Sequence, residues 1–271
     1  MIDRTLRHAR LIASLGRYTL AREMSFRGNY LVKLAVELLW LFILLAFYKT
    51  VFMKTSTVAT WTEPQYLFFV GCHFALNGLI ETLFMDGCVD FTELVRTGDL
   101  DFILLKPIDE QVLVTCRKID WGTSLNVVMG GVVMALALYQ MSWRFDLVRA
   151  VAFLVTFVCG TAIAYSFMLA LTSFSVWLVR NQSLMEMWWL FSSLARYPRE
   201  IFRSLTWAEP LSFMFTYILP FLLVVNVPAN VMVRAFDPAI VAFTLAATAA
   251  SLWGSRWFFR RALRSYRSAS S

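Results

Sequence analysis

The chain has 271 residues, of which 59% are hydrophobic and 16% carry a charge. Soluble domains carry roughly 25% charged residues, and the mean hydropathy of +0.63 departs from them in the same direction. Long apolar runs replace the missing charge, so much of the outer surface must face lipid. The composition excludes an ordinary water-soluble domain and predicts an all-α, polytopic membrane helix bundle with about six spans.

The first thirty residues predict an amphipathic helix on the inner surface of the membrane. Arg10, Arg17 and Arg22 alternate with apolar residues at near-helical spacing, and a basic helix of this kind lies in the interface with its apolar face in lipid. We expect residues 1–30 to form this cytosolic helix, either as a simple anchor or as a helix that transmits movement from a partner. The stretch lacks the apolar core of a cleavable signal peptide, so we expect it to be retained.

A membrane-spanning helix needs about 20 mostly apolar residues, because the hydrocarbon core is about 30 Å thick. Five segments meet this requirement: residues 31–52, 66–85, 125–141, 148–179 and 239–259. Two shorter candidates, residues 184–197 and 211–227, precede the last of them, and only one of the two needs to cross. The other can lie at the surface or enter the membrane and return, since broken backbone is tolerated where protein surrounds it.

Charge predicts the orientation, because Lys and Arg near span ends mark the cytoplasmic side. The N-terminal stretch and the tail at residues 260–271 are both basic, so both termini are expected inside, and six spans satisfy this condition. The same rule would place Arg196, Arg199 and Arg203 inside and make residues 211–227 the crossing segment. The net charge of +7 follows from this bias, and no nucleic-acid partner is expected because no basic soluble module is visible.

The most informative connection is the hydrophilic segment at residues 86–118, which we expect in the cytosol. Between Phe91 and Lys118 it reads FTELVRTGDLDFILLKPIDEQVLVTCRK, with large apolar residues among the charges. Such residues need a surface to bury against. Gly98 can turn the chain and Pro107 ends a helix, which predicts a short helix, a turn and a second short helix. A compact unit of this design can dock into a groove on another protein.

This segment resembles the cytosolic loop of type-2 ABC exporter permeases, which reads roughly glutamate, arginine, G-T-L-E, a leucine pair and x-P after the second span. The residues that carry the resemblance are Glu93, Arg96, Gly98, Asp99, Leu100, Asp101, Leu105, Lys106 and Pro107. Asp99 replaces the usual threonine and Asp101 the usual glutamate, so a short polar residue and an acid are kept. The resemblance implies that these residues form an ATPase-coupling loop.

The resemblance continues toward the C-terminus. Tyr197 and Pro198 are similar to the family's tyrosine–proline turn after the fifth span, and Pro220 and Pro228 lie in what resembles its re-entrant outer segment, here at residues 198–237. The family thus implies that residues 184–197 are the fifth span and that 211–227 enter from outside. The charge rule implies the reverse, and both alternatives stand at this point.

The resemblance implies one transmembrane permease domain over residues 1–271, which acts as the substrate pathway of an exporter in the bacterial cytoplasmic membrane. A separate ABC-type ATPase would carry ATP and Mg²⁺, and a second permease, identical or paralogous, would complete the pathway. No G-x-x-x-x-G-K-[ST] phosphate loop occurs in the sequence, so neither enzyme activity nor a cofactor is expected on this chain. An ATP-independent membrane transporter or a membrane assembly factor is the alternative.

Polar residues within the predicted spans are candidates for the substrate path, because such residues are costly in lipid. His73, Glu81 and Glu186 are these candidates, and for His73 a packed, hydrogen-bonded role is the alternative. Lys33 and Glu37 lie one helical turn apart and are expected to form an ion pair. The two histidines and four scattered cysteines have no metal-ligand spacing, so no metal site is predicted.

Overall fold

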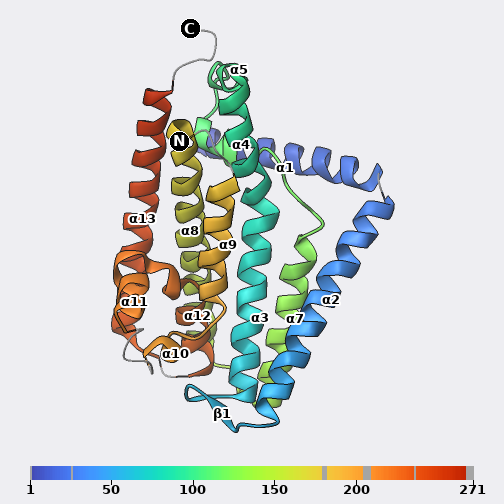
Figure 1. Cartoon of the computed structure of the whole chain (residues 1–271), viewed down its shortest axis with the longest axis vertical. Helices are drawn as coiled ribbons and strands as arrows, with labels where there is room; N and C mark the ends of the chain where they lie inside the picture. Colours follow the sequence, from blue (N-terminus) through green and yellow to red (C-terminus); the bar gives the residue numbers. More distant parts are fainter. Residues whose placement is uncertain (1, 26, 179–181, 204–208, 235, 267–271) are drawn as a thin grey trace.

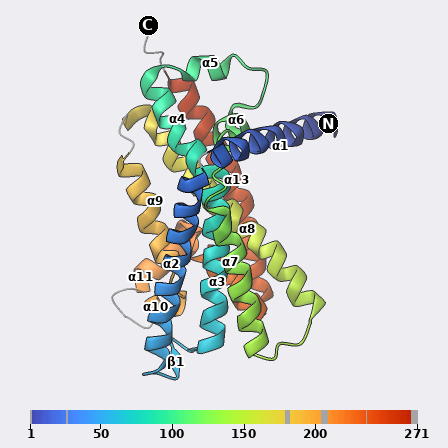
Figure 2. The same ribbon diagram turned by 90° about the vertical axis from the view of Figure 1, so that its right-hand side faces the viewer.

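A computed structural model describes residues 2–25, 27–178, 182–203, 209–234 and 236–266. Within this part of the chain, the only strands are the two-residue β1 (Thr57–Val58) and β2 (Trp61–Thr62), which pair as an antiparallel hairpin. The principal helices are α1 (Ile2–Ser25), α2 (Arg27–Phe52), α3 (Glu63–Ile80), α7 (Ser124–Gln140), α8 (Leu147–Leu178), α9 (Gln182–Ala195) and α13 (Pro238–Ser265). All but α1 run roughly along the long axis, whereas α1 lies across one end of the bundle (Figures 1 and 2).

Four helical stretches are long and apolar enough to cross a membrane: α2, residues 63–97, α8 and α13. A further pair, Glu209–Ile218 and Pro220–Val233, is bent by 82° and brings the total to five if it counts as one span. The shorter α7 is apolar as well, and both α7 and α9 run alongside the long helices (Figure 1). The chain is therefore a multi-pass, all-α membrane protein, as the sequence predicts.

The second span is longer than the sequence suggests. Helix α3 continues through a π-helical turn, η1 (Glu81–Met85), into α4 (Asp86–Thr97). The predicted loop at residues 86–118 therefore begins as helix, because no proline occurs between Glu81 and Gly98 and the apolar Phe91 and Leu94 are buried on one face. A continuous helical rod thus extends from the membrane bundle to the end that carries α1.

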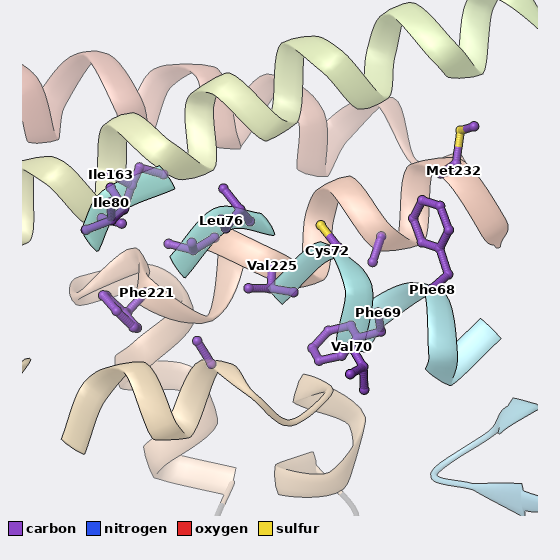
Figure 3. Close-up of a cluster of buried hydrophobic side chains, with 14 of the residues drawn as sticks. Phe68, Phe69, Val70, Cys72, Leu76, Ile80, Ile163, Phe221, Val225 and Met232 are labelled. Atoms are coloured by element: carbon purple, nitrogen blue, oxygen red, sulfur yellow. The ribbon is translucent and has the colours of Figure 1, made fainter. Parts of the chain in front are cut away.

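Glycines allow α3 and α7 to pack backbone against backbone. A Cβ atom built at Gly130 would lie 2.5 Å from the Gly71 carbonyl oxygen, and one at Gly78 would lie 2.6 Å from Asn126 Cβ. Small residues permit this close approach between membrane helices. On its other side α3 contributes Phe68, Cys72 and Leu76 to a buried apolar cluster that α8 and α12 (Leu223–Val233) complete (Figure 3).

The direction of the chain bears on the two alternatives for residues 184–227. Helix α13 ends, and α1 begins, at the end that carries α5 (Leu100–Leu104), whereas the β-hairpin and α10 (Arg199–Arg203) lie at the opposite end (Figure 1). Helix α9 (Gln182–Ala195) therefore runs away from the end that carries α5 and toward the end that carries α10 (Figure 1). The proposal that Arg199 lies at the same end as the termini is wrong for this structure.

Two arginines beyond α9, Arg199 and Arg234, lie near the same carboxylate, that of Glu200. Glu200 Oε1 lies 3.6 Å from Arg199 Nε and 3.7 Å from an Arg234 nitrogen. Glu200 Oε2 also accepts a hydrogen bond of 3.1 Å from the indole N–H of the fully buried Trp61, and the Arg234 guanidinium lies 4.8 Å from the centre of that ring. The first spans usually dominate the orientation of a membrane protein, so basic residues this far along the chain constrain it less, which is why the charge rule misleads here.

The adjacent glycines of α7 provide a matched test of this packing. We expect Gly130→Val to lower the thermal unfolding midpoint in detergent, because overpacking costs about 1–3 kcal/mol and the new side chain would meet the α3 backbone. Gly131→Val is the control, since no described atom lies within 4 Å of a Cβ built there. Equal shifts for the two variants would contradict the close α3–α7 contact.

Candidate functional site: the knob of residues 86–118

Three short helices form a compact projection at one end of the bundle, which we call the knob (residues 86–118). Helix α4 ends at Gly98, whose φ of 83° lies in the left-handed region, where other residues pay about 1–2 kcal/mol. Helix α5 follows, and α6 (Glu110–Cys116) begins after Asp109. Lys106 and Pro107 form the turn between α5 and α6. The predicted helix–turn–helix is present, with a third helical segment added.

The underside of the knob is an apolar cluster. Its buried members on the knob are Phe91, Leu94, Leu100, Ile103, Leu113 and Val114, and they pack with Leu169 of α8 and Phe259 of α13. These apolar residues of the knob are therefore buried within the chain itself. Leu100 is completely buried, so it holds the knob on the bundle and cannot contact a partner.

The outward face of the knob carries the remaining residues of the loop motif. The exposed members are Glu93, Arg96, Asp99, Leu105, Lys106 and Pro107, whereas Gly98 and Asp101 are half-buried. Glu93 and Arg96 form an ion pair one turn apart. Phe102 and Leu105 are 70% and 81% exposed. Phe102 is missing from the sequence motif, although its three-residue spacing from Leu105 on a helix could have indicated it.

A polar clamp joins the knob to two spans. Asp109 Oδ1 accepts hydrogen bonds of 3.2 and 3.4 Å from the first backbone N–H groups of α6, and Arg256 of α13 donates to Asp109 Oδ2 at 2.6 Å. Arg256 also donates to Gln111 Oε1 at 3.1 Å, and the Gln111 amide donates to the Tyr165 hydroxyl of α8 at 2.7 Å. The start of α6 is therefore bonded to both α8 and α13.

Electrostatics strengthen this clamp at neutral pH. Partial burial acts to raise the pKa of the Asp109 carboxyl, but the hydrogen bond and charge of Arg256 and the two backbone N–H groups together hold that pKa below its ordinary value. At the other end of α6, Asp90 of α4 pairs with Arg117 and Lys118. The knob is thus closed on itself and attached to the bundle by charged groups as well as by apolar packing.

The polar candidates within the spans lie in different environments. His73 is buried, and its Nε2 accepts a 3.0 Å hydrogen bond from the Asn77 amide, whose oxygen accepts one from Ser192 of α9. This arrangement matches the packed, hydrogen-bonded alternative for His73. Glu81 is half-buried in η1, whereas Glu186 is exposed on α9. The structure does not bring these three residues together.

The expected ion pair between Lys33 and Glu37 is wrong. Lys33 Nζ pairs with Asp120 at 3.1 Å, and Glu37 accepts a 3.0 Å hydrogen bond from the Asn126 amide of α7. Both partners lie on another element, so sequence spacing along α2 does not reveal them. Helix α2 is joined to the rest of the bundle by these two contacts.

The prolines beyond α9 occupy distinct places. Tyr197 is exposed and Pro198 is buried just after α9 ends, and the backbone N–H of Arg199 donates to Asn226 of α12 at 2.8 Å. Pro220 begins the short η3 (Pro220–Leu222) at the sharp bend that follows α11 (Glu209–Phe213) and η2 (Met214–Ile218). Pro228 is buried inside α12. The bend has the shape of a broken span or a re-entrant segment.

A family model described as ABC-2 family transporter protein matches residues 38–270. The match covers most of the spans and the whole knob, so the chain belongs to this family and is a membrane transport protein. No curated protein and no solved structure matches the chain significantly.

The clamp can be tested with two aspartates that begin helices in the same way. We expect Asp109→Ala to speed hydrogen–deuterium exchange across α6, because it removes a helix cap worth about 1 kcal/mol and the bond to Arg256. Asp146→Ala is the control, since Asp146 caps α8 and pairs with Arg149 far from the knob. Faster exchange in the knob for both variants, or for neither, would contradict the clamp.

The same clamp predicts that hydrogen exchange in α6 depends on pH. Because the folded pKa of Asp109 is lowered, its stabilising contribution is present above the ordinary carboxyl pKa and is lost as the pH falls through the folded value. Exchange in α6, corrected for its intrinsic pH dependence, should therefore increase in acid for the native chain. In Asp109→Ala this increase should be smaller.

Proposed function

We propose that this chain is the membrane-spanning permease subunit of an ABC-type exporter and that the knob binds a separate ATPase subunit. The observation that carries this proposal is the exposed pair Phe102 and Leu105, 70% and 81% exposed, on a rigid projection at one end of the bundle (Figure 1). Large apolar side chains held in water are typical of surfaces that bind a partner. Family membership supports the same assignment.

The attachments of the knob support a mechanical role. Its first helix continues α3 without a break, its apolar underside rests on α8 and α13, and Arg256 clamps its last helix. A displacement of the knob therefore acts on three membrane helices at once. ATP binding by the partner would favour one of two arrangements of these helices through its different contacts with each, which is how the substrate side would alternate.

The orientation follows from the same assignment. We place the knob and both termini in the cytoplasm of a bacterium and the β-hairpin and α10 outside its inner membrane. The bent pair lies in the half of the bundle opposite the knob (Figure 1), which supports a re-entrant segment that enters from outside. The most apolar part of α2 is only 6% buried, which leaves a long face for lipid and for a second permease chain.

The exposed pair gives a direct test of ATPase binding. We expect Phe102→Ala with Leu105→Ala to weaken co-purification of an ABC-type ATPase roughly tenfold or more, because buried apolar anchors dominate binding energy. Folding should be unaffected, since both side chains are exposed. Phe145→Ala, at an equally exposed phenylalanine between α7 and α8, is the matched control.

Two results would overturn the proposal. Unchanged ATPase binding by the double variant would remove the knob from the interface. Native chain that purifies without any ABC-type ATPase, and whose transport persists without ATP, would instead favour the ATP-independent transporter.

A further inference from the structure

A cavity of about 210 Å³ lies between α8, α13 and the proline bend. Helix α8 contributes Ile163, Phe167 and Ala170 to its wall, the bend contributes residues 218–221, and α13 contributes Ser251, Gly254 and Phe258 among others. Neither the loop motif nor the proposed coupling uses this cavity.

The lining is suited to an apolar occupant. Among the described residues that line the cavity, none carries a charge. The hydroxyl of Ser166 donates to its own helix at the Ala162 carbonyl, 2.8 Å away, and that of Ser255 donates to the Leu252 carbonyl at 3.2 Å. These hydroxyls are already satisfied, so they offer little to a polar ligand. A cavity of about 150 Å³ lined by apolar residues stays dry and takes up benzene, and this one is larger.

The depth of the cavity identifies the kind of apolar molecule. Residues 163–170 extend from the middle of α8 (Leu147–Leu178) toward the knob, and residues 251–258 lie in the knob-side half of α13 (Pro238–Ser265). Both helices are long enough to span the bilayer, and Tyr165 and Arg256 contact the knob from the same stretches, so the cavity lies in the knob-side half of the membrane. Its rim includes Ile218, which is 65% exposed, and thus faces lipid.

We propose that this cavity binds one hydrocarbon chain of a bilayer phospholipid, which enters sideways from the membrane. The headgroup of that lipid stays at the interface, because no charged group in the described lining could replace its hydration. The hydrocarbon chain of the lipid would contact Leu219 and Pro220 at the sharp bend, as well as α8 and α13. A bound lipid therefore fills the space under the bend and supports its shape.

The test uses the glycine in the wall. No described atom lies within 4 Å of a Cβ built at Gly254, so Gly254→Leu places a side chain in the cavity without a backbone clash. The protein is reconstituted in vesicles of one synthetic phosphatidylcholine, which carries a diazirine in the distal half of one acyl chain. After illumination, labelled peptides are mapped. Wild type should be labelled at residues 163–170, 218–221 and 251–258, and Gly254→Leu should lose this labelling about tenfold.

Three controls make the result specific. Labelling of α2, which faces lipid elsewhere, should not change in Gly254→Leu. Gly131→Leu, at a glycine with equally open surroundings, should keep the wild-type pattern. A diazirine next to the headgroup should not label the three segments. Ser251→Leu, from the same wall, replaces Gly254→Leu if that variant fails to fold.

Other outcomes would overturn the proposal. Labelling of the three segments no stronger than that of α2 would mean that the cavity holds no bound chain. Unchanged labelling in Gly254→Leu and Ser251→Leu would place the lipid elsewhere. Chain-to-chain cross-links at residues 251–258 in place of lipid adducts would show that a second copy covers the cavity.

Discussion

The close backbone contact between α3 and α7 is the constraint on which the arrangement of this protein depends. Inside a bilayer the hydrophobic effect does not press helices together, so packing and small residues must do so. Gly71, Gly78 and Gly130 remove the side chains that would hold the two helices apart. As a result α3 is buried over most of its apolar length, and α8 and α12 pack around it.

The position of the knob is fixed by this central helix, α3. Because α4 is a continuation of α3, the knob cannot move as an independent loop, and its underside is seated on α8 and α13. Leu100 and Phe102 have different environments, since Leu100 is fully buried and Phe102 is 70% exposed. Neighbouring residues of one short helix thus serve attachment to the bundle and contact with water.

Patterns that depend on local sequence were predictable. The apolar runs predict the helical spans, Gly98 predicts the turn, and the prolines predict a broken segment before α13. Contacts between distant segments were not predictable, because spacing along one helix carries no information about other elements. Lys33 accordingly pairs with Asp120, and the bond of Asp109 to Arg256 joins residues far apart in the chain.

The wide turn at Glu81–Met85 has a geometric consequence for the whole inner end. Each residue of an α-helix rotates the chain by about 100°, and a π-helical turn takes up one residue more than an α-helical turn. Every side chain after Met85 therefore points about 100° away from the direction that an uninterrupted α-helix would give it. Phe91 and Leu94 reach the cluster on α8 and α13 from a helix phased in this way. The orientation of the knob is thus set by a single extra residue within the helix that connects it to the bundle.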